Sequence, residues 1–86
     1  MPEISRFFGI VITMYFDDHA PPHFHARYHD ENVVIAIDSL EVIEGSMRSK
    51  ELGLVTNWAA QHRAELRDAW NKAEEYEAPG KIDPLT

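Results

Sequence analysis

The sequence contains no cysteine. This absence excludes disulfide bonds, zinc sites built from thiolates, iron–sulfur clusters and cysteine nucleophiles. A chain of 86 residues is the size of one domain and too short for two, so we predict a single domain over residues 1–86. Domains this small bury a modest core, which makes a dimer or a complex with another protein a reasonable expectation.

Positive charge is also scarce. Lysine and arginine number 8 against 15 aspartates and glutamates, which gives a formal net charge of −7. Binding to a nucleic-acid backbone requires clustered positive charge, and the sequence has no basic run, so general nucleic-acid binding is disfavoured. Histidines beside Arg6 and Arg27 become positively charged below pH ~6.5, so one small basic patch is still compatible with the sequence.

Long apolar runs are missing as well. The longest, over residues 7–16, falls well short of the roughly 20 residues that span a bilayer. It has no preceding basic segment and no following small-residue cleavage site, so it does not resemble a signal peptide. We therefore expect a soluble, cytoplasmic protein with no membrane partner.

What the sequence does contain is a series of short segments typical of strands. Phe7–Phe16 is rich in β-branched and aromatic residues, and its even-numbered side chains are all apolar. Three further strands are predicted at His23–His29, Val33–Ile37 and Leu40–Ile43, separated by proline-rich or polar turns. These segments predict a small antiparallel sheet of three or four strands within residues 1–45.

Alternation of side chains predicts how the first two strands pair. A hairpin that places Phe16 opposite Phe24, and Tyr15 opposite His25, brings the apolar partners onto one face. The histidines of segment 23–29 then lie on the polar face of the sheet rather than in the core.

Residues 46–76 predict one long helix. Ser46 is a plausible N-cap, and Ala78-Pro79-Gly80 ends the helix. We expect this helix, about 40 Å long, to pack on one face of the sheet, which gives an α+β fold. Residues 77–86 form a tail that is either anchored by Ile82 and Leu85 or disordered. The apolar stripe that indicates the helix comprises Leu52, Val55, Ala59, His62, Leu66, Ala69 and Ala73.

Two tryptophans and one histidine lie on or beside this stripe. Trp58 and Trp70 are expected to pack in the core, with a place in an interface as the alternative. A lone histidine on an apolar stripe, such as His62, is usually a hydrogen-bonded core residue rather than a ligand.

The stretch Asp17–His25 carries the residues most suited to chemistry. His23 and His25 alternate on one strand face with Cα atoms about 6.6 Å apart, a spacing that suits two imidazoles on one cation. His19 or a carboxylate of Asp17-Asp18 adds a third ligand, so the candidate metal ligands are Asp18, His19, His23 and His25. Imidazole with carboxylate suits zinc, nickel, iron or manganese. The alternative is that the aspartates hold the histidines by hydrogen bonds without a metal.

The same face also fits acid–base hydrolysis without a metal, for example RNA cleavage. His23 and His25 would serve as base and acid, Arg27 or Arg6 would stabilise the developing charge, and Tyr15 would position the substrate. A third reading is a binding module, because tyrosine, tryptophan and arginine are enriched in protein interfaces.

Several motifs together resemble one known family. Pro2-Glu3-Ile4-Ser5-Arg6-Phe7, Asp18-His19 and Pro21-Pro22-His23-Phe24-His25-Ala26 are similar to the small bacterial domain-of-unknown-function family 4160. Arg48-Ser49 departs from that family, which commonly has proline followed by a basic residue there. The resemblance implies an operon-encoded protein paired with another short protein, in the manner of a toxin–antitoxin component. We therefore expect action through a protein partner, with a hydrolase that uses His19, His23 and His25 as the alternative.

Overall fold

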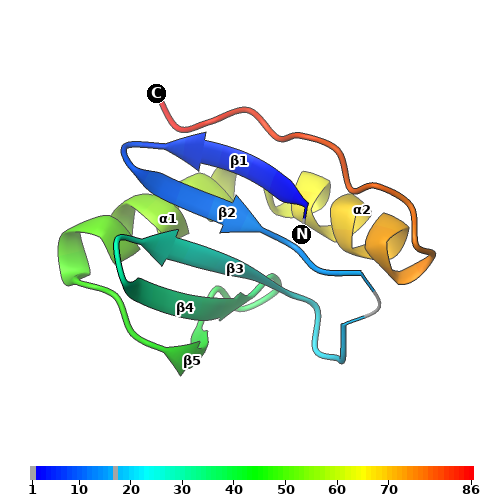
Figure 1. Ribbon diagram of the computed structural model, residues 1–86, viewed down its shortest axis with the longest axis horizontal. Helices are drawn as coiled ribbons and strands as arrows, with labels where there is room; N and C mark the ends of the chain where they lie inside the picture. Colours follow the sequence, from blue (N-terminus) through cyan, green and yellow to red (C-terminus); the bar gives the residue numbers. More distant parts are fainter. Residues whose placement is uncertain (1, 17) are drawn as a thin grey trace.

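Five strands form one antiparallel sheet in the order β1-β2-β3-β4-β5, and two helices follow it in the chain (Figure 1). The computed structural model describes residues 2–16 and 18–86 of the chain. The predicted α+β class is confirmed, but the sheet has five strands rather than three or four. The elements are β1 (Glu3–Phe7), β2 (Ile10–Thr13), β3 (His23–Tyr28), β4 (Glu31–Ala36), β5 (Val42–Gly45), α1 (Ser49–Gln61) and α2 (Arg63–Glu74).

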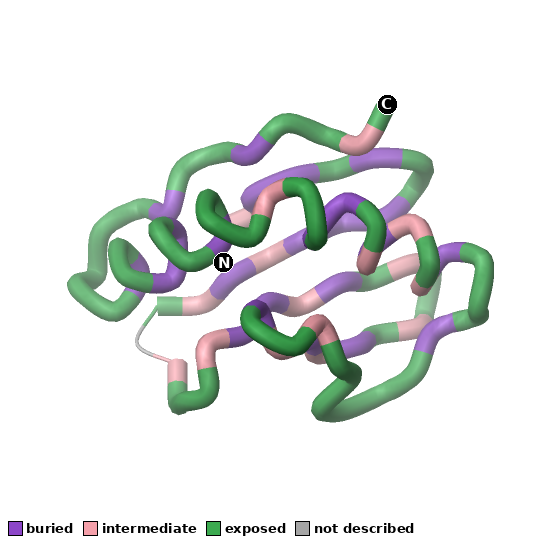
Figure 2. Tube along the Cα trace, turned by 180° about the vertical axis from the view of Figure 1, so that it is seen from behind, coloured by how far each residue is buried: buried purple, intermediate pink, exposed green. Residues whose placement is uncertain are grey.

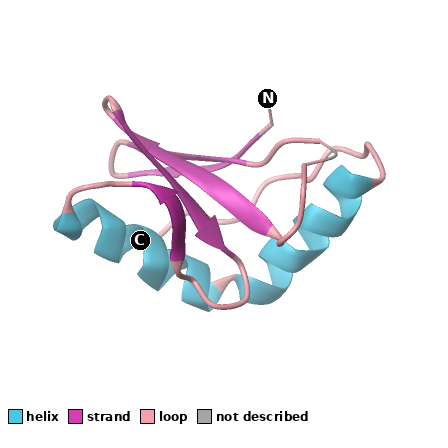
Figure 3. Cartoon of the chain, turned by 90° about the horizontal axis from the view of Figure 1, so that it is seen from below, coloured by secondary structure: helices cyan, strands magenta, loops and turns pink. Residues whose placement is uncertain are grey.

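The molecule has two layers, with both helices on the same face of the sheet (Figure 3). Apolar side chains of the strands, such as Phe24 and Ile35, meet the helices in a core around the fully buried Trp58. The outward sides of the helices are exposed (Figure 2). Among the described residues, no helix covers the other face of the sheet, and this open face carries the candidate site.

The predicted first strand is in fact two strands. A turn at Phe8 and Gly9 divides Phe7–Phe16 into β1 and β2, and both turn residues have positive φ angles, 48° and 80°. Two-residue hairpin turns that match the twist of the strands require this conformation. Phe8, one of the even-numbered apolar side chains of the predicted strand, is consequently 61% exposed at the tip of the hairpin.

The pairing of β2 with β3 differs from the predicted register. Ile12 lies opposite Ala26 and Thr13 lies opposite His25, where the sequence placed Tyr15 opposite His25. The difference is two residues, so the side chains of the paired residues 10–13 and 25–28 keep their predicted faces. An apolar pattern with a period of two does not distinguish registers that differ by two.

The predicted helix over 46–76 is also divided. It begins at Ser49 rather than after Ser46, and it breaks at His62, whose φ is −124°. A straight helix over residues 49–74 would be about 39 Å long, whereas the longest dimension of the whole molecule is 33 Å. The break lets both halves of the apolar stripe face the sheet. None of the helices in the described chain is long and apolar enough to cross a membrane.

The C-terminal tail is ordered along the edge of β1 (Figure 1). The Ile82 N–H donates to the Ile4 carbonyl at 2.7 Å, and the Trp58 indole N–H donates to the Asp83 carbonyl at 2.7 Å. Ile82 is buried and Leu85 packs against the core. The predicted anchors are therefore confirmed and the disordered alternative is wrong.

Candidate functional site

Two prolines fix the loop that leads into β3. Proline has no N–H to donate, but its carbonyl oxygen still accepts hydrogen bonds. The Pro22 carbonyl accepts from the Ile37 N–H at 3.0 Å, and the Pro21 carbonyl lies 2.7 Å from Nδ1 of His23. The loop is thereby attached both to the end of β4 and to the first side chain of β3.

The side chain of His23 is buried, whereas the sequence predicted that it lies exposed on the polar face of the sheet. That prediction is wrong for His23. Its ring is only 4% exposed and lies 5.1 Å from the indole ring of Trp70, centroid to centroid. At this end of the sheet, α2 reaches the first residue of β3 and covers it. Trp70 therefore belongs to the core, as predicted, and also holds His23 in place.

Three predicted ligands come together around one carboxylate. Oδ2 of Asp18 lies 2.9 Å from Nε2 of His23 and 3.4 Å from Nε2 of His25. One ligand atom from each of the three residues falls within 4.8 Å of the others. Two ligand atoms each about 2.1 Å from a zinc ion, at angles between 90° and 110°, lie about 3.0–3.4 Å apart. The two separations measured from Asp18, 2.9 and 3.4 Å, are close to that spacing.

The hydrogen bonds of His23 constrain its protonation. A carbonyl oxygen only accepts, so Nδ1 of His23 carries a hydrogen toward Pro21. In the neutral ring, Nε2 then has a lone pair, and it points at a carboxylate oxygen of Asp18. Two lone pairs at this distance repel unless a proton or a metal cation lies between them. A backbone carbonyl on the far nitrogen of a histidine is also the usual support of a metal ligand.

The pKa values of two ligands are shifted. Burial raises the pKa of the Asp18 carboxyl, but hydrogen bonds from the His19 N–H, His23 and His25 outweigh burial and lower it below its ordinary value. Burial lowers the pKa of His25, against the smaller opposing effect of Asp18. Both shifts favour the forms that bind metals, a carboxylate and a neutral imidazole.

His19, the fourth predicted ligand, lies at the edge of this group. Its Nδ1 is 3.0 Å from Oδ1 of Asp18, the other carboxylate oxygen, and its side chain is 87% exposed. The predicted approach of Asp17 to this cluster lies outside the described residues. His62 does not join the cluster, because its Nδ1 contacts Glu65 at 2.6 Å and its ring packs beside Trp58.

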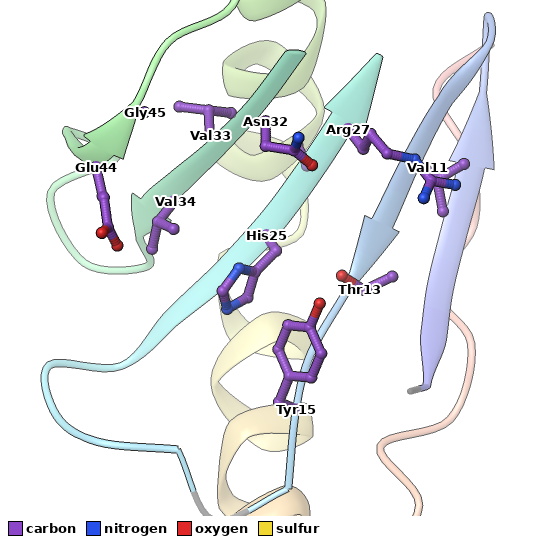
Figure 4. Close-up of a pocket in the computed structure, with 11 residues that line it drawn as sticks. Val11, Thr13, Tyr15, His25, Arg27, Asn32, Val33, Val34, Glu44 and Gly45 are labelled. Carbon is purple, nitrogen blue, oxygen red and sulfur yellow. The ribbon is translucent and has the colours of Figure 1, made fainter. Parts of the chain in front are cut away.

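A hollow of about 260 Å³ extends from His25 over the open face (Figure 4). Tyr15 packs edge-on against His25 with ring centroids 4.5 Å apart, and both rings point into the hollow beside Thr13. Arg27 lines the other end, and Figure 4 shows its side chain directed toward Val11. Of the predicted catalytic residues, Tyr15 and His25 are therefore in contact, whereas Arg27 lies at the other end of the same hollow.

Glu44 of β5 is a site residue that sequence reasoning missed. It lines both this hollow and a smaller one of about 90 Å³ that contains Asp18, His23 and His25. The pairs His25–Val34 and Val34–Glu44 place it two strands away from His25 in one cross-strand row. Figure 4 shows its carboxylate on the far side of Val34 from the His25 ring. Only the pairing of β5 with β4 brings it here, and no local motif indicates that pairing.

Comparison with known proteins places the chain in a family. Residues 9–71 match the model of a family described as a domain of unknown function, DUF4160. No curated protein and no solved structure matches the chain. The matched region includes the whole loop with Asp18, His23 and His25, together with Glu44.

Proposed function

Because the chain belongs to the DUF4160 family, whose description assigns no activity, we propose from the site geometry that the protein is a metal-dependent hydrolase. Asp18, His23 and His25 hold a divalent transition metal such as zinc. The observation that carries this proposal is that Nε2 of His23 and Nε2 of His25 both approach the same carboxylate oxygen of Asp18, at 2.9 and 3.4 Å.

Three protein ligands and an open side are the usual composition of a catalytic zinc site. The ligand set here is two imidazoles and one carboxylate, and the small hollow beside it shares His25, Val34 and Glu44 with the larger hollow on the open face of the sheet. A divalent cation in this position would lower the pKa of a bound water toward neutrality. A purely structural zinc site would instead have four protein ligands and no adjoining groove.

Glu44 is the proposed general base. It lines the hollow with the ligands, and its side chain forms no hydrogen bond or ion pair within residues 2–16 and 18–86. In the proposed reaction the water oxygen bonds to the electrophilic centre while Glu44 accepts the water proton. The bond to the leaving group then breaks, and Glu44 returns the proton to it. Tyr15 orients the substrate against His25, and the exposed Arg27 attracts an anionic group farther along the groove.

A hydrolysis assay tests this proposal. We expect the protein loaded with zinc or manganese to hydrolyse p-nitrophenyl acetate or bis(p-nitrophenyl) phosphate, and EDTA to abolish the activity. Glu44→Gln should lower kcat by about 100-fold, the lower end of the general-base range. Glu41→Gln, an equal charge change at an exposed position of the same edge, should leave kcat unchanged. Absence of chelator-sensitive hydrolysis of both substrates would contradict the proposal.

Action through a protein partner is the second candidate. The observation that favours it is β5, an edge strand on which Val42 and Ile43 are 42% and 48% exposed. Edge strands present backbone groups that pair readily with another strand. We expect two β5 edges to pair in a homodimer, which light scattering would detect as a doubled mass. The double variant Val42→Thr/Ile43→Thr should be monomeric, and a monomeric wild type would contradict this pairing.

A further inference from the structure

Another hollow lies at the opposite end of the sheet from the Asp18 loop. It has a volume of about 410 Å³ and is lined by Phe8, Tyr28, Lys50, Glu51 and Leu54. The turn between β1 and β2, the end of β3 and the first turn of α1 meet there (Figure 1). The proposed hydrolase chemistry uses none of these residues.

The carboxylate of Glu51 is the unusual group in this hollow. Its side chain is only 7% exposed, and its Oε1 is buried without a hydrogen-bond partner among the described residues. Burial of a carboxylate without a partner is costly, and it is normally relieved by a cation or by hydrogen-bond donors. In a helix, a glutamate at this third position often bonds the N-cap N–H. Here Glu31 of β4 accepts from that N–H, on Arg48, at 3.0 Å, so Glu51 is not used as a cap.

Phe8 forms an exposed wall of the same hollow. It is 61% exposed and adopts a φ of +48°, a conformation that is costly for a residue with a bulky side chain. A small polar residue would suit this hairpin turn better. In this hollow, Phe8 therefore offers a planar cation a ring to stack on, and Glu51 offers it a carboxylate oxygen that has no hydrogen-bond partner among the described residues.

We propose that this hollow binds an arginine side chain from a partner protein. A guanidinium is planar, so it can stack on the ring of Phe8, and its forked N–H groups can donate to Glu51. It is also less strongly hydrated than an ammonium, which lowers the cost of entry into a partly apolar site. The net charge of −7 favours partners that carry basic residues.

The two cations already present at this end form no hydrogen bond or ion pair with Glu51, although Arg48 lies near enough to attract it electrostatically. Arg48 donates from Nε and Nη2 to Glu31 at 3.2 and 3.4 Å, and its guanidinium lies 5.2 Å from the centre of the Tyr28 ring. The fold itself therefore already stacks one guanidinium at Tyr28. Lys50 adjoins Glu51 in the helix, and consecutive helical residues do not face each other. No ion pair of Lys50 with Glu51 is formed within the described chain.

An NMR titration of the full chain tests the proposal with blocked amino acids. We expect N-acetyl-arginine methylamide to shift the amide signals of Phe8, Glu51 and Leu54 in a saturable manner. The citrulline analogue, which has the same shape without the charge, should cause no such shift. Glu51→Gln should raise the Kd at least about tenfold, the factor expected for one lost charge-assisted hydrogen bond. Glu41→Gln is the matched control and should bind normally.

Several outcomes would overturn the proposal. Equal shifts from the arginine and citrulline compounds would exclude charge recognition. Tighter binding of tetramethylammonium would identify a small quaternary cation as the ligand, and tighter binding of free arginine would identify a metabolite rather than a partner protein. If Glu51→Gln does not fold, binding of N-acetyl-arginine methylamide is measured with Phe8→Ser instead, because the exposed position of Phe8 tolerates the change. If Phe8→Ser binds as tightly as the wild type, the ring of Phe8 does not contribute to binding and the proposal is overturned.

Discussion

Gly45→Ala is expected to detach β5 and to impair the site through Glu44. Gly45 has a φ of +78°, and an added Cβ would lie 2.2 Å from the carbonyl oxygen of Asn32. That oxygen belongs to the backbone and accepts the Ser46 N–H at 3.0 Å. The alanine therefore cannot be accommodated by a side-chain rotation, and β4 and β5 must separate.

The expected loss of folding stability in Gly45→Ala is the sum of three contributions. A left-handed alanine costs about 1 kcal/mol, loss of the Ser46 hydrogen bond costs about 1 kcal/mol, and displacement of packed backbone adds about as much again. A loss of about 3 kcal/mol is a large part of the roughly 4–13 kcal/mol expected for 86 residues. It corresponds to a fall in Tm of about 12–24 °C.

Urea and thermal unfolding measure this loss, and Gly53→Ala provides the control. Gly53 lies in α1, and nothing lies within 4 Å of an added Cβ there. This alanine should stabilise the protein by about 0.5–1 kcal/mol through helix propensity. Stability of Gly45→Ala within about 0.5 kcal/mol of the wild type, the usual range of surface substitutions, would refute the reasoning.

Two further predictions concern the contacts that join the elements. The pKa of Glu31 is lowered first by the hydrogen bond from the Arg48 N–H and then by the Arg48 side chain. Its stabilising effect is therefore complete above the ordinary value of 4.5 and lost as the pH falls through the lower folded value, so Glu31→Gln should flatten the pH dependence of unfolding in that acid range. Trp58→Phe keeps an aromatic ring but removes the donor to the Asp83 carbonyl, and should cost about 1 kcal/mol for the hydrogen bond in addition to the cost of the space left in the core. Hydrogen exchange should then show faster exchange of the Ile82 amide, and unchanged protection would contradict a role for this bond.

Side-chain alternation predicted the faces of the sheet but not its turns. It placed His25 and Tyr15 on the open face, and the two rings are in contact there. It missed the turn at Phe8 and Gly9 because phenylalanine is not a usual residue for a positive φ. The break at His62 was also missed, because the sequence around it contains neither glycine nor proline and the break serves the fit of two helix halves to one sheet.

The site residues that lie close together in the sequence were predicted, and the contacts between residues far apart in the sequence were missed. Asp18, His23 and His25 lie within eight residues of each other, so composition alone indicated them. The burial of His23 depends on Trp70 in α2, and the approach of Glu44 depends on the position of β5 at the sheet edge. Both are long-range contacts that carry no signal in their own neighbourhood.

Calorimetric titration of the metal-free protein with zinc tests the central claim most directly. We predict binding of one ion per chain at micromolar or tighter affinity. The affinity should be lost in Asp18→Asn and in His25→Gln, provided that circular dichroism shows both to be folded, and it should be retained in His62→Gln. Absence of binding heat with zinc, nickel and manganese, or equal binding by all three variants, would contradict the account. The cluster would then be a hydrogen-bonded ion pair between His23 and Asp18.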